Sequence, residues 1–399
     1  MKVLVVDNAH LYKTPDGKYY TPSIYSYEFF NRYLNTFDEV RFVGKTKYVN
    51  NIDKSKYLLV SGDRLEIYEL PWYQGIKGML KQIVELIIKY RNVSDGCNCC
   101  IFRVAQIESY FAYIFCNKVE KPYAVEVVND PATFVDMPKV FRWINIHLMS
   151  YIVRKANGVS YVTQEYLQKK YPSTARIHGE SDIYFENYYS SIELMTKDLK
   201  SIKKYKDTKK QFEIIHVSNA INNNIKGHKT FIEALKIVSD AGYNISGCCI
   251  GDGQSVDEFK CYANKIGVGK KIEFIGRLHS KNEVINRLAK SDLLVLPTFM
   301  EGLPRTIIEA MAAGLPCLST PVAGIPELLE KQYMFKPDDS KAFAKEIIHL
   351  IENPLELEEA SRNNIEIAKR YTHEKLTERR NSFYCKLRNI VDKKHFVKN

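Results

Sequence analysis

No stretch of this 399-residue sequence is apolar over the roughly 20 residues that a membrane-spanning helix needs. No signal peptide is expected either, because the chain opens with MKVLVVDNAH, which already has the pattern of a strand. The nine cysteines follow no metal-ligand spacing, so we expect small buried thiols rather than disulfides or a zinc site. These absences predict a globular cytoplasmic protein that binds no metal.

Acidic residues are too few to balance the basic ones, and the formal net charge is +11. Two segments, 194–210 and 371–399, have a net charge of +5 each and so carry most of this surplus. An anionic membrane surface or a diphosphate-bearing acceptor would suit such a basic strip, but solvated lysines on a linker and a fraying tail give the same pattern. No zinc finger, helix-turn-helix or aromatic RNA-binding signature is present, so nucleic acid is not an expected partner.

A chain of this length is too long for one core and is a natural size for two domains. In each half, short β-branched runs alternate with amphipathic segments, which predicts the α/β class with doubly wound parallel sheets. In the first half, helices are expected at 22–34, 76–90, 107–116 and 138–156.

The strand and helix pattern restarts at residue 213, after a lysine-rich stretch. We therefore predict two Rossmann-like domains, at 1–195 and 211–370. A basic linker at 196–210 joins them, and a final helix lies in 371–399.

The most informative segment is 294–328, LVLPTFMEGLPRTIIEAMAAGLPCLSTPVAGIPEL. It predicts a buried strand stopped by Pro297, a loop, a helix from about Pro304 to Ala313 and a second strand. The start of a helix that follows a parallel strand is an anion site, because its N–H groups and its dipole both favour phosphate. A carboxylate one turn into that helix can accept hydrogen bonds from a sugar diol, so the segment suits a sugar nucleotide.

The segment resembles the nucleotide-sugar signature of the retaining glycosyltransferases of family 4, in its Glu-x7-Glu spacing, its EGLP loop and its EAMAAGLPCLST continuation. This resemblance implies the two-domain B-type glycosyltransferase fold, in which two Rossmann-like domains face a central cleft. It makes 1–195 the acceptor domain and 211–370 the nucleotide-sugar domain, and it implies that the helix in 371–399 crosses back to the first domain. It also implies that Glu301 addresses the hydroxyls of the donor sugar and that Glu309 binds the ribose diol. The other residues that it places around the donor are Gly302, Leu303 and Pro304 at the sugar and Arg305 and Thr306 at the diphosphate.

A second segment, IIHVSNAINNNIKGHKTFIEAL, resembles the family's diphosphate loop in its Lys226–Gly227 pair, which opens a helix. The family also has an arginine in this loop, whereas Asn219 occupies the nearest place here. A neutral amide stabilises a leaving diphosphate less than a guanidinium does. Either Arg277 supplies the missing charge, or Lys226 acts without a second cation.

The triplet of Gly276, Arg277 and Leu278 follows an expected strand and resembles the family's loop around the nucleobase. A glycine directly after a strand is common, so this similarity is less specific than the other two.

The N-terminal half departs further from the family, which usually has a Gly-Gly loop after its first strand. Here only Gly17 is found, and Tyr19 and Tyr20 occupy roughly that place. His10, Asn129 and Asp130 lie near expected strand ends. Each of these residues could bind the acceptor, and each could equally be structural.

The expected helix at 76–90 has one apolar face and lysines on the other. Such a helix can dock on an anionic membrane, or it can pack on its own sheet with a solvated back.

These patterns predict an enzyme that transfers a hexosyl unit from a nucleoside-diphosphate sugar to a hydroxyl of a glycan or lipid-linked acceptor. The resemblance implies retention of the anomeric configuration, a front-face reaction in which the departing diphosphate takes the acceptor's proton, and no need for a metal or another cofactor. By analogy we expect work on a bacterial surface polysaccharide at the inner face of the cell membrane. A sugar-nucleotide epimerase or hydrolase on the same fold, and a non-catalytic binder, are the alternatives.

Overall fold

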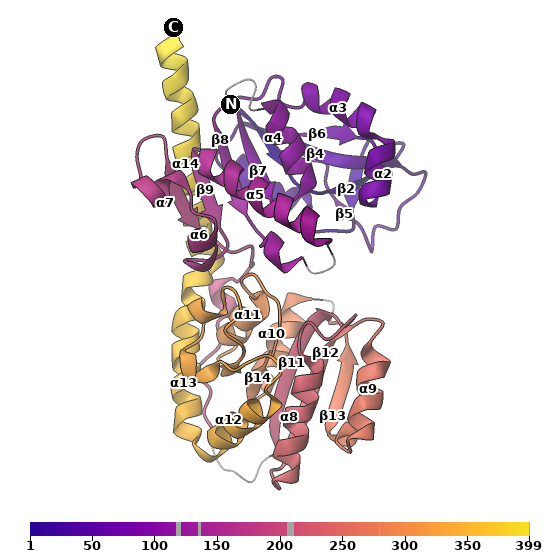
Figure 1. Ribbon diagram of the computed structural model, residues 1–399, viewed down its shortest axis with the longest axis vertical. Helices are drawn as coiled ribbons and strands as arrows, with labels where there is room; N and C mark the ends of the chain where they lie inside the picture. Colours follow the sequence, from indigo (N-terminus) through magenta and orange to yellow (C-terminus); the bar gives the residue numbers. More distant parts are fainter. Residues whose placement is uncertain (117–120, 135–136, 206–210, 279, 399) are drawn as a thin grey trace. The chain divides into compact units, whose positions relative to one another are not determined.

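The computed structural model describes residues 1–116, 121–134, 137–205, 211–278 and 280–398 (Figure 1). Residues 206–210 of the predicted linker therefore lie outside the described residues. The chain divides into two compact units. Unit 1 comprises Met1–Val162, Leu167–Tyr189 and Thr377–Asn399, and unit 2 comprises Thr163–Tyr166 and Ser190–Leu376.

The centre of unit 1 is one sheet, in the order β10-β9-β8-β7-β1-β4-β2-β3-β5, with β6 beside β4. Its pairs are parallel except at β3, which runs antiparallel to β2 and β5. The parallel strands β1, β7, β8 and β9 are buried along almost their whole length, as expected for strands covered on both faces. The strands are β1 (Lys2–Val6), β2 (His10–Lys13), β3 (Tyr19–Thr21), β4 (Glu39–Tyr48), β5 (Leu58–Leu59), β6 (Leu65–Leu70), β7 (Cys99–Val104), β8 (Tyr123–Val127), β9 (Gly158–Tyr161) and β10 (Phe185–Tyr188).

The helices of unit 1 follow the predicted order with two corrections. The helix expected from residue 22 begins later, after Ser26, because Tyr19–Thr21 forms a strand instead. The single helix expected at 76–90 is two helices, because Gln82 between them has φ −103° and ψ 7°, outside the helical range. The helices are α1 (Tyr27–Leu34), α2 (Gly75–Lys81), α3 (Ile83–Arg91), α4 (Ile107–Cys116), α5 (Lys139–Lys155), α6 (Tyr166–Lys170), α7 (Thr174–His178) and α14 (His373–Lys398), which joins unit 1 from Thr377 on.

Unit 2 has a five-stranded sheet in the order β13-β12-β11-β14-β15, and all of its pairs are parallel. The strands are β11 (Phe212–Ala220), β12 (Ile245–Asp252), β13 (Ile272–Gly276), β14 (Leu293–Val295) and β15 (Cys317–Leu318). The helices are α8 (His228–Asp240), α9 (Val256–Lys265), α10 (Lys281–Lys290), α11 (Arg305–Ala312), α12 (Ser340–Glu352) and α13 (Pro354–Ala368). The predicted fold class, α/β with two doubly wound parallel sheets, is confirmed.

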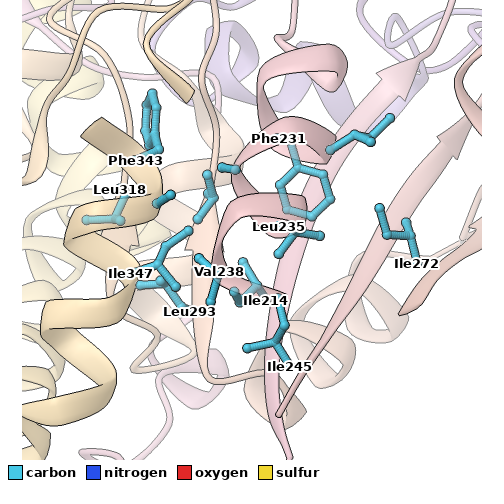
Figure 2. Close-up of a cluster of buried hydrophobic side chains, with 14 of the residues drawn as sticks. Ile214, Phe231, Leu235, Val238, Ile245, Ile272, Leu293, Leu318, Phe343 and Ile347 are labelled. Atoms are coloured by element: carbon cyan, nitrogen blue, oxygen red, sulfur yellow. The ribbon is translucent and has the colours of Figure 1, made fainter. Parts of the chain in front are cut away.

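The core of unit 2 is apolar. Figure 2 shows Leu235 and Val238 of α8 and Ile347 of α12 close to Ile214 of β11 and Leu293 of β14, and all five are buried. Their helices fit the sheet because the apolar residues recur at helical spacing along one face.

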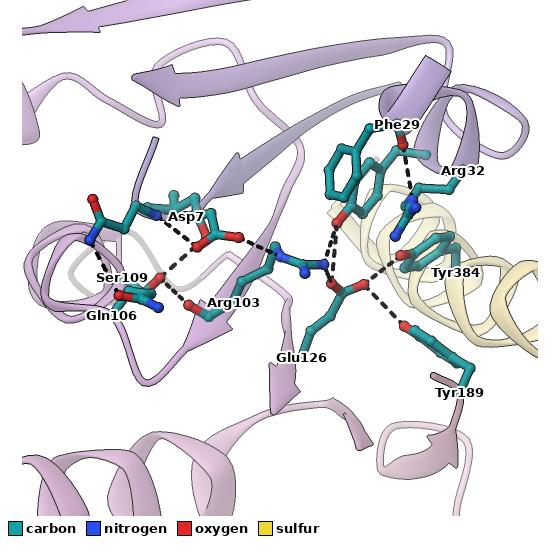
Figure 3. A network of polar contacts seen from close by, with 12 residues as sticks. Asp7, Phe29, Arg32, Arg103, Gln106, Ser109, Glu126, Tyr189 and Tyr384 are labelled. Atoms are coloured by element: carbon teal, nitrogen blue, oxygen red, sulfur yellow. Dashed lines mark hydrogen bonds and ion pairs between the residues drawn. The ribbon is translucent and has the colours of Figure 1, made fainter. Parts of the chain in front are cut away.

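The centre of unit 1 contains charges instead. Arg103 of β7 donates from Nε to Asp7 at 2.6 Å and from Nη1 to Glu126 of β8 (Figure 3). Glu126 also accepts hydrogen bonds from the buried phenols of Tyr189 and Tyr384, the latter on α14. Burial alone would raise the pKa of Glu126, but the charge of Arg103 and the bond from Tyr384 hold it below the usual value. Polar contacts therefore fasten α14 to the sheet.

Within the described parts of the chain, no helix has both the length and the apolarity to cross a bilayer. Seven of the nine cysteines are buried, as expected, whereas Cys261 and Cys385 are exposed.

Candidate functional site

The loop between β14 and α11 is held by buried hydroxyl groups. Ser319 donates from Oγ to the carbonyl of Leu296 at 2.7 Å, and Thr320 donates from Oγ1 to the carbonyl of Thr298 at 2.8 Å. Both donors follow β15, the strand beside β14. The predicted strand, loop, helix and second strand are confirmed to within two residues at each end.

The loop between β11 and α8 is bonded to this first loop. The N–H of Phe299 donates to the carbonyl of Ile225 at 2.8 Å. Gly227 has φ +76°, and a Cβ there would lie 1.9 Å from the carbonyl oxygen of Pro297. Only glycine fits this close approach, which explains why a glycine follows Lys226.

Lys226 and Glu301, predicted from separate motifs, meet in the structure. The Lys226 ammonium lies 2.6 Å from Oε1 of Glu301 and 3.2 Å from the carbonyl of Met300. The lysine side chain is 31% exposed and the glutamate 13%, so the pair is reachable from solvent. A cation beside a carboxylate at a loop edge can meet a ligand that carries both an anionic group and hydroxyls.

The remaining donor candidates on this loop lie at the start of α11. Leu303 and Pro304 are buried, Gly302 accepts a hydrogen bond from the N–H of Gly324 at 2.9 Å, Thr306 is half-buried and Arg305 is exposed. Glu309 lies one turn further on, and burial raises its pKa against the opposing charges of Arg305 and Lys281. A desolvated carboxylate of this kind gains from a hydroxyl donor.

Four predicted donor residues stand apart from the ion pair. Asn219 is exposed at the end of β11, and Gly276 ends β13 with φ +77° ahead of the exposed Arg277 and the half-buried Leu278. These residues and the β14–α11 loop all follow the carboxyl ends of parallel strands, where α/β sheets bind ligands. Among the described residues, neither Asn219 nor Arg277 bonds to Lys226 or Glu301.

Sequence reasoning missed two histidines behind the Lys226 loop. His216 of β11 and His228, the first residue of α8, are buried with ring centroids 4.5 Å apart. A ring nitrogen of His216, Nδ1, lies 2.9 Å from the carbonyl of Val295. Burial lowers the pKa of His216 to about 4 and that of His228 to about 2, so both are neutral near pH 7. The signal was a histidine inside the apolar run IIHVS and another after Gly227.

The predicted acceptor residues in unit 1 are not brought together. Tyr19 bonds to Glu69 through its phenol, and Tyr20 is buried in β3. Asn129 is exposed, but the neighbouring Asp130 is buried and accepts hydrogen bonds at 2.6 Å from Lys170 and from Tyr171.

His10 is different, because it lines a pocket of about 500 Å³ at the carboxyl edge of the unit 1 sheet. Burial lowers its pKa, with a further contribution from the charge of Lys45. Lys45 and Glu108, which sequence reasoning missed, line the same pocket. In the sequence, Lys45 is part of a strand and Glu108 lies in the first turn of a helix 63 residues later, and no motif links the two.

Parts of the chain are similar to known proteins. Residues 198–370 match the family described as glycosyl transferases group 1. The chain is 29% identical over 351 residues to Protein CapJ of Staphylococcus aureus, covering 85% of this chain and 83% of that protein. It is 28% identical over 183 residues to the N-acetyl-alpha-D-glucosaminyl L-malate synthase of Bacillus anthracis, which is 45% of either chain.

Two solved structures have a similar fold. The Anabaena protein HepE in complex with UDP-glucose aligns with a TM-score of 0.64 at 16% identity, over 96% of this chain and 98% of that one. The lipopolysaccharide outer core galactosyltransferase WaaB aligns with a TM-score of 0.66 at 15% identity, over 96% and 99%. The chain therefore has the GT-B fold and is an enzyme of the glycosyltransferase class, and its residues 198–370 are similar to the glycosyl transferases group 1 family.

Proposed function

We propose that this enzyme is a retaining glycosyltransferase of family 4 that moves a hexosyl unit from a nucleoside-diphosphate sugar to a hydroxyl of a glycan or lipid-linked acceptor. The observation that carries the proposal is the Lys226–Glu301 ion pair beside the start of α11. The complex of the similarly folded HepE with UDP-glucose supports a sugar nucleotide as donor.

Each charged group at this edge has a distinct task in the proposal. The Lys226 ammonium neutralises the diphosphate as the glycosidic bond breaks, and Glu301 then accepts hydrogen bonds from hydroxyls of the donor sugar. Glu309, one turn into α11, accepts hydrogen bonds from the ribose diol, which offset the cost of its burial. The N–H groups of Arg305 and Thr306 face the diphosphate.

Catalysis in this proposal needs no metal or other cofactor. The acceptor hydroxyl attacks from the face that the diphosphate leaves, and the departing diphosphate takes its proton. The protein positions the two substrates and stabilises the leaving group.

We also propose a cytoplasmic enzyme that contacts the inner face of the cell membrane. The lysines of the predicted linker give little support to membrane contact. Lys203 bonds to the carbonyl of Ala289 and Lys204 to Glu358, so both ammonium groups already have partners within unit 2. Better support comes from α2, where Ile76 and Leu80 are 51% and 58% exposed. Its exposed lysines could meet anionic headgroups.

Turnover of UDP- and GDP-sugars with and without an acceptor panel, in buffer with EDTA, tests the function. Transfer that requires acceptor and survives EDTA is expected. Release of free nucleoside diphosphate without any acceptor would identify an epimerase or hydrolase, and tight binding without turnover would identify a non-catalytic binder. Loss of transfer in EDTA, restored by manganese or magnesium, would overturn the metal-free reaction.

A further inference from the structure

The pocket in unit 1 has a polar floor. It lies where β1, β4 and β7 approach their carboxyl ends, and Asn8, Lys45, Tyr73 and Glu108 line it. Lys45 and Glu108 are buried, at 3% and 1% exposure, with Nζ and Oε1 2.7 Å apart. The buried ion pair is therefore built into a cavity of the size that small-molecule sites have.

One oxygen of this floor lacks a partner. Oε1 of Glu108 accepts from Lys45 and from the Tyr73 phenol, at 2.7 and 2.9 Å. Lys45 also donates to the Asn8 side chain at 2.6 Å. Oε2 of Glu108 is buried, and none of the described residues donates to it. Leaving a buried carboxylate oxygen unpaired is unfavourable, so the floor calls for a hydrogen-bond donor from a ligand.

The walls of the pocket are apolar and open to solvent. Ile114 of α4 and Phe141 and Ile144 of α5 line it and are 51%, 51% and 39% exposed. On the α2 side, the pocket is lined by Met79 and the exposed Ile76. Exposed apolar surface of this extent around a cavity is typical of a binding site.

Basic residues surround the apolar wall. Lys77 and Lys81 on α2 and Lys139 at the start of α5 are exposed. The expected packing of the apolar face of 76–90 onto its own sheet is thus only partly right, because Met79 of that face is buried while Ile76, Leu80 and Val84 are exposed. An apolar wall with a cationic margin is complementary to a lipid with an anionic headgroup or neighbour.

We propose that this pocket binds the acceptor and selects a lipid, in which an apolar chain lies against α4 and α5 and a hydroxyl donates to Oε2 of Glu108. The inference rests on the proposed function and narrows its acceptor class from glycan or lipid to lipid. A free glycan does not suit the site, because most of its hydroxyls would face the apolar wall without partners.

The test is calorimetric titration of the full-length enzyme with n-octyl β-D-glucopyranoside below its micelle concentration, and with methyl β-D-glucopyranoside as the tail-less probe. The octyl compound is expected to bind one site and the methyl compound not to bind. Ile144→Asp should weaken octyl glucoside binding by about tenfold or more, because it places a charge on the apolar wall. Val84→Asp, at a more exposed position outside the pocket, is the matched control and should bind normally.

Glu108→Gln tests the floor separately. It keeps the shape and an oxygen for Lys45 but removes the charge that pairs with the ammonium, so a lower unfolding temperature is expected. The folded variant should bind octyl glucoside about tenfold or more weakly, because the carboxylate oxygen is missing. Should the Glu108→Gln variant prove unfolded, Ile144→Asp still decides the matter. Equal binding by wild type and Ile144→Asp, or equal loss in Val84→Asp, would overturn the proposal, and so would binding of the methyl compound with the same affinity.

Kinetics separate this inference from the proposed function. With a lipid-linked acceptor, Ile144→Asp should raise KM for acceptor about tenfold while KM for the nucleotide sugar is unchanged. Transfer by Ile144→Asp with an unaltered KM for acceptor would show that the acceptor does not bind in this pocket, and it would not contradict the proposed function. Octyl glucoside binding at this pocket without turnover of any sugar nucleotide would refute the proposed function instead.

Discussion

The ion pairs around Arg103 in unit 1 and at Lys226 in unit 2 differ in how deeply they are buried. In unit 1, Arg103 lies at the centre of the sheet between Asp7 and Glu126, and all three are at most 5% exposed. In unit 2 the corresponding interior is apolar, and the Lys226–Glu301 pair lies at a loop edge with a lysine that is 31% exposed. A buried pair is costly to break, because it leaves a charge without compensation, whereas a partly exposed pair contributes little to stability. The difference indicates that the central charges around Arg103 support the structure of unit 1, whereas the Lys226–Glu301 pair of unit 2 is placed to meet a ligand.

The largest expected effect is in unit 1. Arg103→Met should destabilise it by about 3–5 kcal/mol, because Asp7 and Glu126 would lose their shared counter-charge. In unit 2, Leu235→Met preserves core volume and should cost less than about 1.5 kcal/mol. Denaturant-dependent hydrogen exchange, which resolves the two units, is the measurement. Equal losses in the two variants would remove the contrast between the interiors.

The next effect concerns activity. Lys226→Ala should lower turnover by about 100-fold, or about 2.7 kcal/mol, because the diphosphate gains charge only as the glycosidic bond breaks. The KM for donor and the unfolding free energy should change little, since the pair is partly exposed. Lys229→Ala, on the exposed side of α8, is the control. Near-normal turnover in Lys226→Ala would point to Arg277, which Arg277→Ala then tests.

A smaller effect separates the two glutamates of the donor loop. Glu309→Ala should weaken binding of UDP or GDP alone by about 10- to 100-fold, because a charged acceptor contributes about 1.5–3 kcal/mol per hydrogen bond. Glu301→Ala should leave free-nucleotide binding intact and impair transfer. Calorimetry with the free nucleotides measures both, and an equal loss in the two variants would contradict the division of roles.

The last effect is on acid stability, and it is gradual with pH. His216 and His228 have native pKa values of about 4 and about 2, both below the ordinary value of about 6.5. The unfolded chain therefore binds more protons below pH 6.5, and the stability of unit 2 should fall as the pH drops, by about 1.4 kcal/mol per pH unit for each histidine. Between pH 6.5 and 4, two histidines contribute to this pH dependence in the wild type and only His216 contributes in His228→Leu. Their part of the slope of unfolding free energy against pH should therefore be half as steep in the variant. An unchanged slope would show that His228 is protonated in the native state.

Much of unit 2 is predictable because its signals are local. The apolar strand before Pro297, the helix after Pro304 and the glycine after Lys226 each follow from neighbours within a few residues. In unit 1 the same reasoning found the long helices but missed the β2–β3 pairing and the break at Gln82. It also proposed Asp130 for the acceptor, a residue whose carboxylate binds Lys170 and Tyr171 instead.

The sequence by itself determined the α/β class, the restart of the pattern in the second half and the donor motifs, because hydrophobic period and turn residues act over short distances. Only the tertiary structure decided that Lys226 meets Glu301, 75 residues away, and that Lys45 meets Glu108, 63 residues away, at the floor of a pocket. Such contacts depend on strand order and register, which place distant carboxyl ends side by side, and no local pattern encodes which side chains will then face each other.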